Sequence, residues 1–349
     1  MYWKYAVRRI LNGILSYIII IFILSALFNT VMEETARTQI EETVRGELMG
    51  IQQARQMTAE EIQNYYRERL DFFGKQYMLD RPVFERILFR TWNTLTFRFG
   101  RSTSIRSAQG ERDVFTIVWE VVPRTVSLFT VAMAINIMIG LWLGIRKARK
   151  PGKTLDKSTS IATMIVFGMP AWWLGMMLIM LFSYTLRLFP SGGMVSTPPP
   201  TGIHYFLDML YHMALPLMTL VLIGFWGSAF LTRNIVLSIL QEDFIMSARA
   251  RGLPERKVMY GHTLRTAAPP VVTMALLSLL ATVAGSIIFE GIFSWPGLGN
   301  LYWVAVSQND IPVLMGNLSL TVGLYISGLV ILDLIYGFLD PRIKVGGRR

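Results

Sequence analysis

Few side chains in this 349-residue chain are of types that perform chemistry. Cysteine is absent, which excludes a disulfide framework and a thiolate nucleophile or metal ligand, and the only histidines are His204, His212 and His262. His204 and His212 lie eight residues apart near Asp208 in an expected outer loop. A metal site is possible there, but a solvated or interfacial role is the better interpretation. We therefore expect no metal, no cofactor and no catalytic residue.

One short triplet looks like part of a phosphate-binding loop. Gly152-Lys153-Thr154 matches the end of a P-loop, but the first glycine of that loop would fall on Lys147. The triplet also lies in a lysine-rich turn rather than after a buried strand. We expect no phosphate site here, so any motor must be supplied by another chain.

The most informative polar stretch, 241–270, reads as helix, break, helix. Good helix formers precede Gly252, which can take the left-handed conformation that ends a helix, and Pro254 suits the first turn of the next helix. Ala248 and Ala250 are small enough for another surface to approach closely. A docking element has this composition, and so does a loop stabilised by its charges. Local chemistry leaves both interpretations open.

Polar side chains inside apolar stretches are the other candidates, because in lipid they face the protein interior or a water path. The alternative for each is a hydrogen bond between helices. Asp333, near the end of its stretch, is expected to reach the interface or to pair with an arginine. The candidates for a water path are Asn136, Thr163, Ser228, Thr282, Ser286 and Asn317.

The elements that position these residues are membrane-spanning helices. Charged residues make up 16% of the chain, whereas roughly a quarter is usual in soluble proteins. A helix crosses the hydrocarbon with about 20 mostly apolar residues. We expect the third stretch to tilt and to kink at Pro170. Six stretches without Asp, Glu, Lys or Arg are long enough: Ile10–Phe28, Thr125–Ile145, Ser158–Leu186, Met213–Thr232, Thr266–Phe289 and Ile311–Leu332.

Positive charge predicts the orientation of these spans. Lys and Arg concentrate in 146–157, in 233–265 and at the two ends of the chain, whereas 187–212 has only Arg187 and 290–310 has none. The positive-inside rule then places both termini in the cytoplasm. The same rule accounts for the net charge of +11 without any nucleic-acid partner.

The long segment 29–120 carries nearly balanced charge and is expected to be a helical extracytoplasmic domain. Residues 35–55 are expected to be helical, and Thr58 with Glu61 predicts a capping box that opens a helix ending at Gly74. Aromatic residues after Arg81-Pro82 suggest a return to the membrane surface. The predicted divisions are 1–28 (N-terminus and first span), 29–120 (outer domain), 121–340 (a five-helix core containing 233–265) and 341–349 (a basic cytoplasmic tail).

Six motifs in order resemble one family over residues 120–344. Ala248-Arg249-Ala250-Arg251-Gly252-Leu253 is followed by His262-Thr263-Leu264-Arg265 and Pro269. The others are Val122-Pro123-Arg124-Thr125, 167–173, 189–193, 290–299 and Asp340-Pro341-Arg342. Together they resemble the dipeptide/oligopeptide branch of the ABC importer permeases, whose members also carry nickel or oligosaccharides. Met246, His262 and Arg265 depart from the broader importer motif and agree with this branch. The length of the outer domain fits the first, B-type permease of a pair.

The resemblance implies an all-α polytopic membrane protein with six transmembrane helices, an outer helical domain after the first and a cytoplasmic coupling helix between the fourth and fifth. The chain would form half of a translocation path for di- or oligopeptides or related solutes in the plasma membrane (bacterial inner or archaeal). Implied partners are a second permease subunit, two ATPase subunits that bind ATP and Mg²⁺, an extracytoplasmic solute-binding protein and lipid. The chain itself would be no enzyme. The implied ATPase-coupling residues are Glu242, Asp243, Ala248, Arg249, Ala250, Arg251, Gly252, Leu253, His262 and Arg265.

Two other classes of function compete with this interpretation. An ion-driven secondary transporter usually shows internal repeats and carboxylates inside its spans, and this sequence has charge-free spans and no visible repeat. A membrane enzyme is disfavoured by the absence of cysteine and of clustered His, Asp and Glu.

Overall fold

The structure is a computed structural model that describes residues 2–54 and 58–339, and these residues form helices, turns and loops without a β-strand. The predicted basic tail 341–349 lies outside the described residues. Five helices are long and apolar enough to cross a membrane: Tyr2–Ile51, Val114–Arg149, Ile203–Leu240, Glu255–Ala284 and Ile311–Gly337. They contain four of the six predicted spans in full and most of the fifth, Thr266–Phe289, whereas the third is built differently.

The chain divides into two compact units, which are described separately. One consists of residues 1–118 and 304–349, and the other of residues 119–303. Both boundaries fall within helices, namely α4 (Val114–Arg149) and α12 (Leu298–Ser307).

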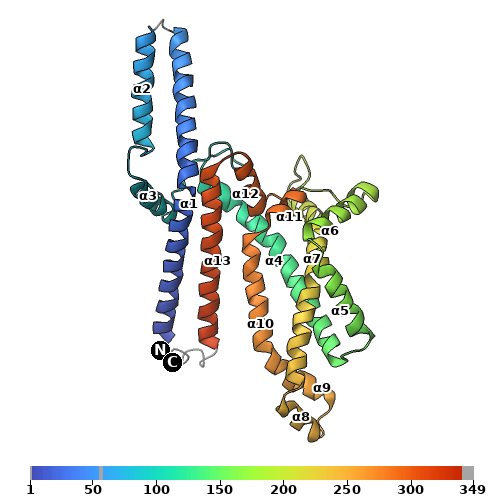
Figure 1. Ribbon diagram of the computed structural model, residues 1–349. Helices are drawn as coiled ribbons and strands as arrows, with labels where there is room; N and C mark the ends of the chain where they lie inside the picture. Colours follow the sequence, from blue (N-terminus) through green and yellow to red (C-terminus); the bar gives the residue numbers. More distant parts are fainter. Residues whose placement is uncertain (1, 55–57, 340–349) are drawn as a thin grey trace. The chain divides into compact units, whose positions relative to one another are not determined.

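In the first unit a single helix, α1 (Tyr2–Ala54), runs without a break from the first apolar stretch into the predicted outer segment (Figure 1). It pairs with α2 (Ala59–Gln76), and the contact is made by Ile40, Val44 and Leu48, which recur every four residues and so share one helix face. Arg69 of α2 adds hydrogen bonds of 2.8 Å to both carboxylate oxygens of Glu47.

The predicted capping box of α2 is confirmed, but its predicted end is wrong. The backbone N–H of Thr58 donates to Glu61 Oε2 at 2.8 Å, and the N–H of Glu61 donates to Thr58 Oγ1 at 3.3 Å. The helix continues past Gly74 to Gln76, and Met78 takes the left-handed conformation with φ +58°. A 2.6 Å ion pair between Lys75 and Asp71, one turn apart, favours this extra turn.

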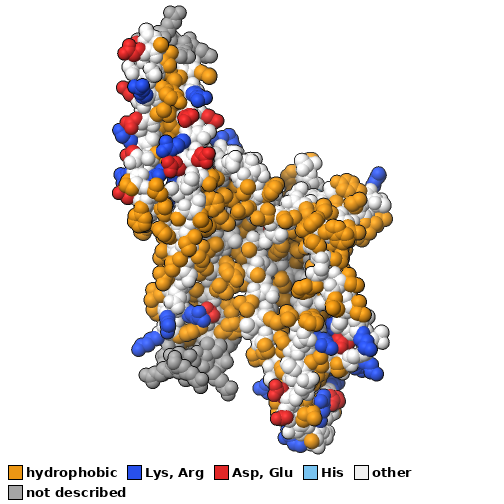
Figure 2. Space-filling model, in the orientation of Figure 1, with side chains coloured by type: hydrophobic (Ala, Val, Ile, Leu, Met, Phe, Trp, Pro, Cys, Tyr) orange, Lys and Arg blue, Asp and Glu red, His pale blue; other side chains and the backbone are white. Residues whose placement is uncertain are grey.

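The last long helix, α13 (Ile311–Leu339), packs beside the first half of α1. Tyr17 and Ser319 share a hydrogen bond of 2.8 Å. Near the chain ends Arg9 pairs with Asp333 at 3.3 Å, which confirms the expected arginine partner. Figure 2 shows hydrophobic side chains over these two helices and charged ones over the α1–α2 hairpin, as expected for lipid-facing and water-facing surfaces.

Asp310 fixes the start of α13. Its Oδ1 accepts the Val313 N–H at 3.3 Å, and its Oδ2 accepts the Ser102 hydroxyl at 2.5 Å and the Thr103 and Ser104 N–H groups at 3.0 and 3.1 Å. One buried carboxylate thus caps a helix and holds the loop before α4.

The short helix α3 (Val83–Leu95) has two different faces. Phe84, Leu88 and Trp92 are exposed, whereas Arg86 is buried on the opposite side. An exposed aromatic stripe beside membrane helices is typical of a helix at the lipid–water interface, in line with the sequence-based expectation.

The second unit is built around α4, α7 (Ile203–Leu240) and α10 (Leu264–Ala281). A helical turn Thr282–Ala284 extends α10, and a π-helical turn Val258–Thr263 precedes it. The remaining helices are α5 (Thr154–Phe167), α6 (Ala171–Leu178) with the π-helical turn Ile179–Thr185, α8 (Asp243–Ala250), α9 (Glu255–Lys257) and α11 (Ile287–Ile292).

Three sequence-based expectations about this unit need correction. The third stretch is no single tilted span, because α5 and the helix after Pro170 meet at 96°; proline lacks an N–H and disfavours helix at the residue before it. The fifth span ends at Ala284, before Gly285 at φ +65°, rather than at Phe289. His204 and His212 lie on α7 and not in a loop.

Candidate coupling segment and polar junctions

Gly252 closes α8 in the way that the sequence predicts. Its φ is +80°, its N–H donates to Arg249 O at 2.9 Å, and the N–H of Leu253 donates to Ala248 O at 3.3 Å. These two bonds form a Schellman motif, which requires a left-handed residue at the glycine position. The sharp turn between α8 and α9 is therefore fixed by backbone hydrogen bonds.

Two residues of α8 anchor it to the rest of the second unit. Ile245 and Ala248 are buried in a cluster with residues of α4, α7 and the segment that leads into α10: Ala148, Val236, Ile239, Val258, Met259 and Ala267. The small size of Ala248 thus serves packing within the chain and not the approach of another surface, whereas Ala250 stays exposed.

The other predicted coupling residues differ in exposure. Leu253 and His262 are half-buried. Pro254 caps α9 just outside its first turn. Arg249 spans the turn and pairs with Glu255 at 2.7 Å, with both side chains open to solvent. The predicted coupling residues that are exposed are Glu242, Asp243, Arg249, Ala250, Arg251, Gly252 and Arg265.

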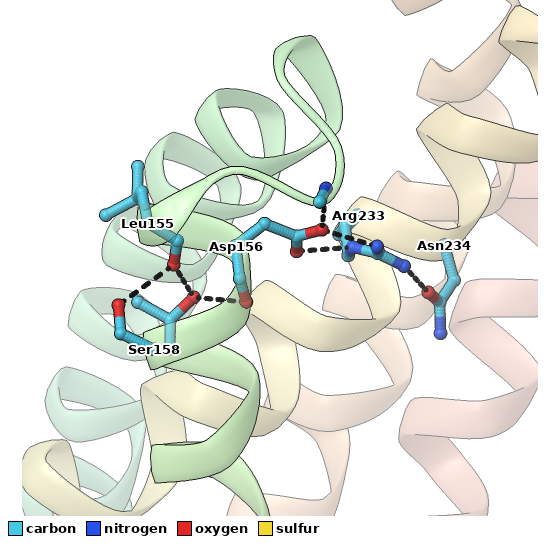
Figure 3. Close-up of polar contacts among 7 residues, drawn as sticks. Leu155, Asp156, Ser158, Arg233 and Asn234 are labelled. Carbon is cyan, nitrogen blue, oxygen red and sulfur yellow. Dashed lines mark hydrogen bonds and ion pairs between the residues drawn. The ribbon is translucent and has the colours of Figure 1, made fainter.

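A buried ion pair close to this segment was missed by sequence reasoning. Arg233 of α7 donates to both carboxylate oxygens of Asp156 at the start of α5, at 2.7 and 2.6 Å, and Gly152 N–H adds a bond of 3.0 Å (Figure 3). Asp156 is 3% exposed, and the nearby Lys147 is 1% exposed. A signal was present, because Asp156 is the one acidic residue in the lysine-rich stretch 146–157.

Four of the motifs that carried the resemblance meet at a second junction around Glu290. Its Oε1 accepts the Thr125 hydroxyl at 3.0 Å, and its Oε2 accepts the Asn300 N–H at 3.0 Å. Thr125 Oγ1 in turn accepts the Leu298 N–H at 2.7 Å. Glu290 is fully buried, so these bonds replace the water that its carboxyl group gives up.

Phe293 connects the other two motifs to the same junction. Its carbonyl oxygen accepts the Gly193 N–H at 2.8 Å, and Ala171 packs against the buried cluster to which the Phe293 ring belongs. Residues from α4, α6, the 189–193 loop and α11 are thereby packed together, although they are far apart in the sequence.

The six candidates for a water path differ in burial and in hydrogen bonding. Asn136 of α4 donates to Leu220 O of α7 at 3.3 Å, and Thr282 shares a hydrogen bond of 2.9 Å with Thr130. Thr163 donates within its own helix, to Thr159 O at 2.7 Å. Asn317 belongs to the first unit and is buried. These contacts are those of helix packing, and only Ser228 and Ser286 of the six keep partial exposure.

Within residues 2–54 and 58–339, no three His, Asp or Glu side chains come together as a metal-binding set. His212 is buried on α7, where its Nδ1 lies 3.0 Å from the carbonyl oxygen of Asp208 in its own helix.

Residues 136–345 match the family model described as binding-protein-dependent transport system inner membrane component. The chain belongs to this family. The matched residues of this inner membrane component contain α8, Gly252 and the buried pair Asp156–Arg233, whereas the predicted outer domain 29–120 precedes them.

Curated relatives of this inner membrane component are named as permeases of oligopeptide, dipeptide and peptidoglycan transport systems. The oligopeptide transport system permease protein AppB of Bacillus subtilis is 31% identical over 272 residues, which cover 78% of this chain and 84% of that protein. The dipeptide transport system permease protein DppB of Escherichia coli K12 is 34% identical over 288 residues, 76% of this chain and 82% of its own. The peptidoglycan transport system permease protein YejB of Agrobacterium fabrum is 34% identical over 278 residues, 77% of this chain and 74% of its own.

A solved structure of the methionine ABC transporter MetNI, inward facing, has a TM-score of 0.44 and 18% identity over 62% of this chain and 96% of that chain. The family resemblance inferred from the sequence motifs is confirmed by the family model and the curated relatives. The family model is described as a component of a binding-protein-dependent transport system, and the curated relatives are named as transport system permease proteins.

Proposed function

We propose that this chain forms half of the translocation path of an ABC importer for di- or oligopeptides or related solutes, oligosaccharides included. The observation that carries the proposal is the similarity to curated peptide permeases, which extends over about three quarters of the chain at 31% to 34% identity. By the same similarity its partners are a second permease, two ATPase subunits that bind ATP and Mg²⁺, and an extracytoplasmic solute-binding protein.

The segment α8–Gly252–α9 is the proposed contact with an ATPase subunit. Three features support this role. Its outer surface carries exposed charges and the small Ala250, its turn is set by the Schellman motif, and its inner side is anchored through Ile245 and Ala248 to α4 and α7. A force applied to the exposed face is passed to two membrane helices by close packing, because a packed core deforms little.

The proposed topology has six spans, with α5 and the helix that follows Pro170 counted as one broken span. Both termini, 146–157 and 233–265 are placed in the cytoplasm by the positive-inside rule. Since Ser228 and Ser286 keep partial exposure, they are the proposed path-lining residues among the six polar candidates. The mechanism is alternating access, in which ATP-driven closure of the ATPase pair reorients the spans.

Gly252→Val tests the proposed coupling contact. An added Cβ at Gly252 meets no atom within 4 Å, so the cost comes from φ +80° alone. That cost is about 1 kcal/mol for a side chain in the left-handed region and more for a β-branched one. We expect normal amounts in the membrane, reduced ATPase co-purification and loss of peptide uptake.

Gly261→Val is the matched control for this experiment. Gly261 follows α9 in the π-helical turn Val258–Thr263, and the nearest atom to its added Cβ is Lys257 Cγ at 3.8 Å. It should leave assembly and uptake close to those of the parent. If Gly252→Val transported peptides as well as Gly261→Val, the segment would not be the contact. If the parent chain, expressed with its partners, took up no peptide, the proposed substrate class would be wrong.

A further inference from the structure

The first unit contains a cavity that the transport function does not account for. It has a volume of about 260 Å³ and lies between α1, α3 and the start of α13. Its walls are partly apolar, with Met32, Ala36 and Phe89 among them, and they also include Arg86 and Arg90. No Asp or Glu lines it among the residues that the structure describes.

Arg86 brings unused donors to this cavity. Its side chain is 5% exposed, and its Nη2 lies 2.9 Å from Glu33 Oε2. Within the described part of the chain, its Nε and Nη1 have no hydrogen-bond partner. A buried donor without an acceptor costs about 1 to 3 kcal/mol, so an acceptor placed beside Arg86 would stabilise this part of the fold.

Arg90, one turn further along α3, lacks an opposite charge of its own. Its Nη1 donates to Asn29 Oδ1 at 2.7 Å and to Asn29 O at 3.2 Å, and both are neutral acceptors. Burial, and then the positive charge of Arg86, lower the pKa of the Arg90 guanidinium. The one carboxylate in contact, Glu33, is shared between Arg86 and Arg37. The cavity therefore holds more positive than negative charge.

The position of the cavity along the membrane helices indicates where its ligand comes from. The α1 residues in its wall begin at Met32, directly after the apolar stretch that ends at Phe28, and Ile311 and Pro312 are the first residues of the last apolar stretch. Both helices reach the edge of the hydrocarbon at this level, which is the depth of the lipid headgroups. The exposed Phe84, Leu88 and Trp92 of α3 fit the same depth.

We propose that this cavity binds the phosphate group of a phospholipid, with Arg86 and Arg90 as its ligands. A guanidinium group presents paired N–H donors that match phosphate oxygens. The phosphate would satisfy Arg86 Nε and Nη1 and neutralise the excess charge, while the apolar wall residues contact the glycerol and upper acyl chains. A bound lipid would fasten α3 and the outer hairpin to the membrane ends of α1 and α13.

The test measures the lipid that the full-length chain retains. The chain is purified with its co-purifying subunits, placed in nanodiscs of phosphatidylglycerol and phosphatidylcholine, and then extracted into detergent. Native mass spectrometry counts bound lipid on the parent, Arg86→Gln, Arg90→Gln and Arg86→Lys. Arg81→Gln is the control, because Arg81 is an exposed arginine of the same region that lies outside the cavity wall. Thermal unfolding with added inorganic phosphate tests free phosphate as the ligand.

We expect retained phosphatidylglycerol on the parent and on Arg81→Gln, and a roughly tenfold or larger loss of affinity on Arg90→Gln, as for lost charge-assisted hydrogen bonds. Arg86→Lys keeps the charge but lacks the paired donors, so it should bind less lipid than the parent. It provides the test of Arg86 if Arg86→Gln fails to fold. Equal retention on the parent and Arg90→Gln would overturn the proposal. If inorganic phosphate stabilised the protein and no lipid were retained, the ligand would be free phosphate and the proposed phospholipid would be wrong.

Discussion

Arg233 of α7 and Asp156 of α5 are joined by two parallel hydrogen bonds of 2.7 and 2.6 Å, seven residues before α7 ends at Leu240. Planar, bidentate pairing of this kind fixes orientation as well as distance. It ties the start of α5 to the helix that leads into α8. The buried Lys147 lies in the same charge cluster, and its Nζ has no hydrogen-bond partner among the residues that the structure describes.

Asp156→Asn should strongly destabilise the second unit. The substitution leaves the buried Lys147 and the partly buried Arg233 without a counter-charge, and breaking a buried ion pair from one side costs about 3 to 5 kcal/mol. Thermal unfolding in detergent measures the effect. Glu255→Gln is the control, because the Arg249–Glu255 pair is open to solvent and such pairs contribute at most about 1 kcal/mol. Equal decreases in melting temperature for the two variants would show that burial adds nothing to the contribution of the Asp156–Arg233 pair.

The stability of the first unit should fall in acid because of Asp310. Burial alone would raise the pKa of this carboxyl group, but hydrogen bonds from Ser102 and from the backbone N–H groups of Ser104, Ile105 and Val313 outweigh burial and lower it. A lowered pKa stabilises the fold above the unfolded value of about 3.9, and this contribution disappears as the pH falls through the folded value.

Melting temperature measured against pH checks this prediction, with Asp310→Asn as the comparison. The difference between the two chains should be constant above about pH 5, where the carboxyl group is ionised in both folded and unfolded chains, and should narrow below about pH 4. A difference that stayed unchanged down to about pH 2 would show that the charge of Asp310 contributes nothing to the fold.

Gly297→Ala should lower the stability of the fold and Gly291→Ala should raise it, although both glycines lie in the same motif. A Cβ at Gly297 would come within 2.5 Å of Glu290 Oε2, whereas a Cβ at Gly291 meets nothing within 4 Å. We expect Gly297→Ala to lose about 1 to 3 kcal/mol by overpacking. Gly291 lies inside α11, so alanine there should gain roughly 0.5 to 1 kcal/mol of helix stability. Thermal unfolding of both variants decides.

The cysteine-free sequence allows a direct test of orientation. Gln63 of α2 and Lys150 after α4 are both exposed. In sealed cells an impermeant thiol reagent should label Gln63→Cys and should label Lys150→Cys only after the membrane is opened. Labelling of Lys150→Cys in intact cells would invert the proposed topology.

Local sequence signals predicted the local features of this fold. Apolar length located five spans, Thr58 and Glu61 marked the start of α2, and Gly252 marked the end of α8. Each of these depends on residues within a few positions of one another, where hydrogen-bond geometry and helix propensity act directly.

Features that depend on tertiary contacts were not predictable in the same way. The pairing of Asp156 with Arg233 joins residues 77 positions apart, and the burial of Ala248 depends on where α4 and α7 end. The 96° bend at Pro170 was predicted only as a kink, because a proline marks a break without setting its angle. Asp208 and two histidines suggested a loop where α7 instead begins early, at Ile203.

The continuity of α1 has a mechanical consequence. A helix of 53 residues is about 80 Å long, and α1 has no proline along this length, so it lacks the usual cause of a sharp kink. The two ends of α1 should therefore move together when the helix tilts. A tilt of one degree displaces one end by about 1.4 Å relative to the other, given this length. A contact that moves the outer end of α1 should therefore also tilt its opposite end.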